Sequence, residues 1–278
     1  MKPISLYATL GLLAALAGCA SDAHLQAVRD FAAESSRFAE YEALSQRYRD
    51  TYQREQPYLS PAADLREKAL DARRHESYGD FVRIERSVAL YLQTLGQLAG
   101  DQRYQFDTQL TELDSAIRAW PDSGLEARHV EAYGKLTELL ARAAGGAQQE
   151  RSVQAMVRAG QQPLQELLDA MSALLRYYDK TSDNEKRIVL GTFETEIPYI
   201  DTPPNRLLAA LAKSQQQDKI AEYKLYAERY RLGEQDLAII ATALQHLDQP
   251  DNQAAVAALE QACQRLRHNR DAAAVHSD

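Results

Sequence analysis

Apolar side chains recur at intervals of three and four residues along almost the whole chain after residue 21. One uninterrupted run reads Phe81, Ile84, Val88, Tyr91, Leu95 and Leu98. This spacing places the apolar side chains on one stripe of a helix and leaves the charged residues on the other side. Ala, Leu, Gln, Glu and Arg are abundant, whereas the β-branched residues that favour strands are sparse. The pattern predicts an all-α fold.

Proline and glycine divide these stripes into separate helices, because proline removes a backbone donor and glycine favours helix ends. Residues 22–56 are expected to form one helix roughly 50 Å long. Helices are expected to break near Tyr78–Gly79, between Gly160 and Pro163, and at Gly233. Short connections make neighbouring helices antiparallel. The sequence therefore predicts an elongated antiparallel helical bundle that is partly coiled-coil-like.

Residues that could cap the start of a helix occur at two further places in the chain. Asp122 or Ser123 is expected to cap the helix that follows a break at Trp120–Pro121. Ser182 and Glu185 have the spacing of a capping box, although residues 186–197 also suit a strand. We favour a helix there because the chain offers no second strand to pair with it.

The first eighteen residues have the outline of a secretory signal, with Lys2 before an apolar run and small residues before Cys19. This run is too short for a transmembrane helix, which needs about 20 apolar residues. The ending Leu16-Ala17-Gly18-Cys19 resembles the lipobox of bacterial lipoproteins. The resemblance implies that residues 1–18 are removed and that Cys19 carries a diacylglyceryl thioether and an N-acyl chain, enough for lasting membrane attachment. An ordinary signal peptide cut at another position is the alternative.

The lipobox resemblance implies a bacterial envelope protein that faces the periplasm. Ala20 follows the cysteine, which by the same resemblance favours the outer membrane. The body is similar over residues 91–101 to uncharacterised proteobacterial lipoproteins, a likeness that implies no function. The expected organisation is a signal peptide at 1–18, a helical body at 19–270 that divides near 198–205, and a frayed tail at 271–278.

Removal of residues 1–18 leaves 260 residues, and their charge and cysteine content exclude several classes of function. They carry 31 basic and 40 acidic side chains, and this net charge of −9 argues against binding to nucleic acid or to anionic lipid. Membrane contact is therefore expected through the lipid at Cys19. Cys263 is then the one remaining cysteine, so no intramolecular disulfide is expected.

The sequence contains no recognisable catalytic or ligand-binding motif. The six histidines are scattered, so no metal site is expected, and no nucleophile elbow or phosphate-binding loop occurs. Cys263 lies on an apolar stripe, where a buried, inert thiol is expected. The spacings of Glu194 with Glu196 and of Asp179 with Asp183 are common in an acidic chain. We therefore predict no catalytic residue, no cofactor and no enzyme activity.

The tyrosines are the one distinctive part of the composition. Tyr223, Tyr226 and Tyr230 share one stripe, which is expected to pack in the core or, as the alternative, to form a partner surface.

Three functions remain open. The first is a non-enzymatic scaffold or interaction module that binds an envelope protein. The second is an immunity or inhibitor lipoprotein that neutralises a periplasmic toxin or hydrolase. The third is a hydrolase or small-ligand binder whose site is formed by dispersed carboxylates and tyrosines, which a deep pocket with converging charged groups would favour.

Overall fold

The computed structural model describes residues 22–100, 113, 116–144, 152–249 and 252–275. The described residues form helices joined by short turns, and they contain no β-strand. An isolated antiparallel bridge joins Trp120 to Leu125 around the turn at Gly124. The predicted all-α helical bundle is confirmed.

The first helix covers residues 22–35. The α-helices that follow are α2 (Ala39–Arg49), α3 (Thr51–Glu55), α4 (Pro61–Ala99), α6 (Ala127–Ala144), α7 (Val153–Ile200), α8 (Arg206–Ala243) and α9 (Gln253–Val275). The short 3₁₀ turns are η1 (Gln56–Tyr58), η2 (Pro121–Ser123), η4 (Pro203–Asn205) and η5 (Leu244–His246).

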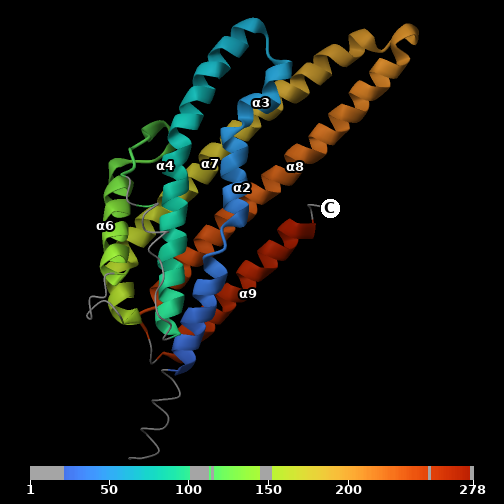
Figure 1. The fold of residues 1–278 in the computed structure, drawn as a ribbon. Helices are drawn as coiled ribbons and strands as arrows, with labels where there is room; N and C mark the ends of the chain where they lie inside the picture. The colour runs from blue at the N-terminus through green and yellow to red at the C-terminus, as the bar shows by residue number, and fades with distance from the viewer. Residues whose placement is uncertain (1–21, 101–112, 114–115, 145–151, 250–251, 276–278) are drawn as a thin grey trace, which may run out of the picture.

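Helix α7 is the central element of the bundle. It packs against α2, α3, α4, α6 and α8, and α9 packs on α8 (Figure 1). Its first turn is capped by Ser152, whose hydroxyl accepts a hydrogen bond from the backbone N–H of Ala155 at 3.1 Å. Helix α4 starts in the same way at Ser60, with Pro61 as its first residue.

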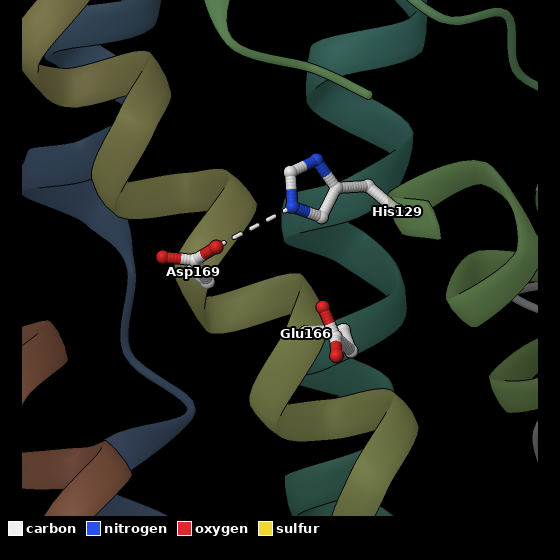
Figure 2. Close-up of side chains that lie close together, drawn as sticks. All are labelled: His129, Glu166 and Asp169. Carbon is white, nitrogen blue, oxygen red and sulfur yellow. Dashed lines mark ion pairs between the residues drawn. The ribbon is translucent and has the colours of Figure 1, made fainter. Parts of the chain in front are cut away.

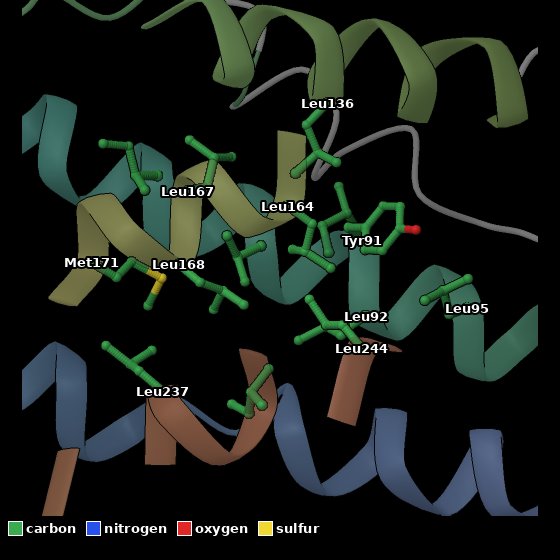
Figure 3. Close-up of a cluster of buried hydrophobic side chains, with 14 of the residues drawn as sticks. Tyr91, Leu92, Leu95, Leu136, Leu164, Leu167, Leu168, Met171, Leu237 and Leu244 are labelled. Atoms are coloured by element: carbon green, nitrogen blue, oxygen red, sulfur yellow. The ribbon is translucent and has the colours of Figure 1, made fainter. Parts of the chain in front are cut away.

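The core lies where α4, α6, α7 and α8 meet. Figure 3 shows leucines from all four helices around Tyr91 and Met171. The predicted stripe of α4 faces this core, since Ile84, Val88 and Leu95 are fully buried. Apolar side chains of this size each contribute about 1.5–3 kcal/mol when they leave water, so the stripes account for the packing of the bundle.

Three of the expected helix breaks are wrong. Helix α4 continues through Gly79, α7 continues through Gly160 and Pro163, and α8 continues through Gly233. In each case the buried stripe stays in phase on both sides of the glycine or proline. Tertiary packing therefore outweighs the local preference of these residues to end a helix.

The opposite correction applies to residues 22–56, which are not one helix. The helical run stops at 36–38 and again at Asp50, which separates α2 from α3. Residues 186–197 are helical, as expected, and belong to α7. Helix α9 reaches Val275, within the segment that the sequence predicts to be frayed. The signal peptide, Cys19 and most of the helix expected before Trp120 lie outside the described residues.

Within the described part of the chain, no helix has a stretch apolar and long enough to cross a bilayer.

Candidate functional site

The tyrosine stripe on α8 lies mostly inside the bundle. Tyr223 and Tyr230 are buried, and Tyr226 is half-buried against the core. The two buried rings are not accessible to a partner, so this stripe is not an exposed docking face.

A buried ionic cluster, centred on Glu185 of α7, surrounds Tyr223. The Glu185 carboxylate is fully buried and accepts two hydrogen bonds from Arg54 of α3, at 3.0 Å to Oε1 and 2.7 Å to Oε2. The Tyr223 hydroxyl donates to Oε1 at 3.0 Å, and Arg47 of α2 places Nη2 3.5 Å from the same atom. Glu185 is therefore the point where α2, α3, α7 and α8 are joined, and it does not cap a helix.

Arg47 extends the cluster to the half-buried tyrosine. Its Nη1 donates to Glu222 at 2.8 Å, and Lys219 donates to the other oxygen of Glu222 at 2.7 Å. The Arg47 guanidinium carbon lies 3.7 Å from the centre of the Tyr226 ring, a cation–π contact. The Tyr226 ring therefore packs over the Arg47 guanidinium, which is almost completely shielded from water.

Arg54 and Tyr223 keep their charge states at neutral pH. Burial works against the charge of Arg54, but its hydrogen bonds to Glu185 raise its pKa above the usual value. Burial and the neighbouring Glu185 carboxylate together raise the pKa of Tyr223. Because neither group exchanges a proton near pH 7, the cluster suits a structural role better than acid–base chemistry.

A second group of polar side chains has the composition of a metal site. His129 of α6 faces Glu166 and Asp169 of α7 (Figure 2), and one ligand atom from each lies within 4.8 Å of the others. His129 is buried, and its Nε2 lies 3.5 Å from Asp169 Oδ2.

The hydrogen bonds around this group argue against a metal ion. His129 Nδ1 accepts the backbone N–H of Glu126 at 3.0 Å, so a neutral ring carries its proton on Nε2, the atom that faces the carboxylates. Arg128 already binds both Glu166 and Asp169. Burial raises the pKa of Asp169, but Arg128 and His129 together hold it below its usual value.

His129 instead caps helix α6. Glu126 directly precedes the first residue of the helix, so its backbone N–H has no partner within the helix. The ring of His129, the third residue of the helix, accepts a hydrogen bond from this N–H, as the side chain at the same position of a capping box does. The expected cap at Asp122 or Ser123 is wrong: the Ser123 hydroxyl donates to the carbonyl of Trp120. This cap could not be predicted from the sequence, because histidine is not among the usual capping residues.

The other residues considered for catalysis do not form a site. Cys263 is buried, and burial raises its thiol pKa to about 11, so the thiol stays protonated at neutral pH. Glu194 and Glu196 are both exposed near the end of α7. Burial and the nearby Asp183 raise the pKa of Asp179, but Asp183 is itself exposed.

An exposed apolar surface occurs on the hairpin made by the end of α7 and the start of α8, residues 190–222, which we call the arm. Of the seven large hydrophobic side chains that are exposed in the described chain, five belong to the arm: Tyr199, Leu207, Leu208, Leu211 and Ile220. Leu207 and Tyr199 are each 75 % exposed. Within the arm only Ile197 and Ala209 are buried, so its two helices cover little of their own apolar surface.

The arm and the N-terminal end of the described chain lie at opposite ends of the molecule (Figure 1). The ring of His24 lies 3.4 Å from the carbonyl of His246, just beyond the end of α8 that is distant from the arm. Helix α8 has 38 residues, which corresponds to about 57 Å. The turn of the arm is closed by an ion pair between Lys213 and Asp201 at 2.8 Å.

Comparison with protein families, curated proteins and solved structures finds no match for this chain.

Proposed function

We propose that this chain is a lipoprotein of the bacterial envelope, anchored through Cys19, that binds another envelope protein through the arm and has no enzymatic role. The observation that carries the proposal is the group of exposed leucines on the arm, Leu207, Leu208 and Leu211. Exposed apolar patches of this kind mark interaction sites in soluble domains. Burying one such leucine in an interface contributes about 1–2 kcal/mol.

The position of the arm supports this role. If Cys19 holds the N-terminal end at the membrane, the arm extends toward molecules at a distance from it. A short rigid turn at Pro203–Pro204 and the ion pair between Lys213 and Asp201 hold the two helices together at their tip. A preformed surface loses less conformational entropy on binding than a mobile loop does.

A protein partner fits the arm better than a lipid surface or a second copy. The arm carries both acidic and basic side chains, whereas helices that bind anionic membranes are predominantly basic. Two copies of the mature chain, each with a net charge of −9, repel one another.

The experiment compares the size of the lipidated protein in mild detergent extracts before and after substitution of the arm. We expect the wild-type chain to migrate in a complex and the double variant Leu207→Gln/Leu211→Gln to migrate alone. The matched control is Leu65→Gln, because Leu65 is 71 % exposed but lies on α4, outside the arm. An unchanged complex in the arm variant, or equal loss in the control, would contradict the proposal.

A further inference from the structure

A cavity of about 210 Å³, lined by both polar and apolar side chains, lies between α3, α4, α7 and the turn η2, away from the arm. Its walls are partly aromatic, with Tyr48, Phe81, Trp120 and Tyr177. An engineered cavity of about 150 Å³ admits benzene, so this space suits a ligand of about ten non-hydrogen atoms.

Two buried charged residues that line the cavity have atoms without partners among the described residues. Glu55 is 2 % exposed; its Oε1 accepts no hydrogen bond from an N–H or hydroxyl donor among the described residues, and its carboxyl is within hydrogen-bonding reach of the Glu67 carboxyl. Arg74 is 7 % exposed; its Nη2 donates to Glu67 at 2.9 Å, but its Nη1 donates to nothing. A buried polar atom that lacks a hydrogen-bond partner lowers the stability of the fold by about 1–3 kcal/mol. A polar ligand in the cavity would supply the missing hydrogen bonds.

Three more charged residues, Arg73, Asp122 and Lys180, line the cavity. Arg73 and Asp122 neutralise each other through a bond of 2.6 Å. Lys180 of α7 also lines the cavity and is exposed, and no described residue pairs with its ammonium. The cavity therefore offers the paired carboxyl groups of Glu55 and Glu67 together with two cationic donors, Arg74 Nη1 and the Lys180 ammonium, that have no partner among the described residues.

We propose that this cavity binds a small zwitterion, namely a free α-amino acid with an apolar side chain. The ligand ammonium binds Glu55 beside Glu67, the ligand carboxylate binds Arg74 Nη1 and Lys180, and the apolar side chain packs on the aromatic walls. A zwitterion pairs with both sets of groups at once, its ammonium with the Glu55 and Glu67 carboxyls and its carboxylate with Arg74 and Lys180, whereas an amine or a carboxylic acid alone pairs with one set.

Proton release is expected to accompany binding. Burial and the adjacent Glu67 raise the pKa of Glu55 to about 8, Arg74 opposes this effect, and Glu185 on α7 adds to it. The Glu55 carboxyl is therefore mostly neutral at pH 7 when the cavity is empty and shares its proton with Glu67, and the ligand ammonium takes the place of that proton. An ammonium group beside it favours the carboxylate, so binding releases about one proton at pH 7 and tightens as the pH rises toward 8.

The test uses the fluorescence of Trp120, which is the one tryptophan of the chain and lines the cavity. The full-length protein is titrated with L-leucine, with 3-methylbutylamine, which lacks the carboxylate, and with 4-methylpentanoate, which lacks the ammonium. We expect L-leucine to bind at least tenfold more tightly than either half-ligand. Calorimetry of the same titration at pH 7 in buffers of different ionisation enthalpy should detect the released proton.

Two variants and two matched controls complete the test. Lys180→Gln and Glu55→Gln should each weaken L-leucine binding at least tenfold. Lys135→Gln removes a comparably exposed lysine from α6, and Glu85→Gln removes a second buried acid, and neither residue lines the cavity. Absence of leucine binding, equal affinity for the three probes, or equal losses in variants and controls would each overturn the proposal and leave a cavity filled by water. Because none of these residues belongs to the arm, such a failure leaves the proposed protein interaction standing.

Discussion

Gly160 is the position at which one added methyl group should do most damage to the bundle. A Cβ at this residue would lie 2.3 Å from both Cε2 and the hydroxyl oxygen of Tyr91, and 2.5 Å from Cζ. Tyr91 has little room to retreat, because it is 1 % exposed and its hydroxyl donates to the carbonyl of Met156 at 2.9 Å. Close packing of α7 against α4 thus depends on a residue without a side chain.

The change in the free energy of unfolding combines one favourable contribution with two unfavourable ones. Alanine favours a helix over glycine by about 1 kcal/mol. Overpacking a filled core costs about 1–3 kcal/mol, and breaking the Tyr91 hydrogen bond to Met156 costs about 1–3 kcal/mol more. We expect Gly160→Ala to lower the free energy of unfolding by about 3 kcal/mol. In a chain of this length that corresponds to a fall in Tm of about 6–12 °C.

Thermal unfolding followed by circular dichroism measures this change, and the chain supplies its own controls. Gly134 and Gly191 also lie inside helices, but an added Cβ at either position meets nothing within 4 Å. Gly134→Ala and Gly191→Ala should therefore raise the stability slightly. The smaller side chain of Tyr91→Leu should recover part of the loss when it is combined with Gly160→Ala. If Gly160→Ala is as stable as the unsubstituted chain, the described packing of α7 on α4 is wrong.

Four further predictions concern charge, packing and attachment. Glu185→Leu leaves the buried Arg47 and the partly buried Arg54 without their shared carboxylate and should cost about 3–5 kcal/mol in urea unfolding, and a loss below 1 kcal/mol would contradict the cluster. Burial and the nearby Glu42 raise the pKa of Glu85 to about 8, so at neutral pH the folded state holds a proton that the unfolded state has lost. The contribution of Glu85 to stability should therefore fall by about 1.4 kcal/mol between pH 7 and 9. Glu85→Gln should reduce this slope, whereas an identical slope would refute the assignment. Tyr226→Ala, at a half-buried ring over Arg47, should lower Tm clearly, and an unchanged Tm would show that the ring does not stabilise the buried charge. Cys19→Ser should abolish membrane fractionation, and a variant that still sediments with membranes after a salt wash would place the anchor elsewhere.

Helix type and the buried faces follow from the sequence because periodicity is a local property. The stripe of Ile84, Val88 and Leu95 is buried as predicted. Helix ends were less predictable, because Gly160 and Pro163 lie inside α7 and are held there by contacts with other helices. A single sequence without those contacts favours a break at both residues.

Long-range partners could not be predicted from the sequence at all. Glu185 lies 131 residues from Arg54 and 38 residues from Tyr223, so periodicity places each of them on a face but does not pair them. The exposure of the arm leucines could not be predicted from periodicity either. Leu207, Leu208 and Leu211 have the spacing of a buried stripe, and only the fold shows that no other helix of the described chain covers them.

The most direct test of the proposed interaction is a photo-crosslinking side chain placed at Leu208 of the lipidated protein in intact cells. We expect one discrete protein adduct at this position, which is lost when Leu207→Gln and Leu211→Gln are added and is not formed by the same crosslinker at Leu65. Adducts that contain only lipid, adducts between two copies of this chain, or identical adducts from Leu208 and Leu65 would contradict the claim that the arm binds a protein partner.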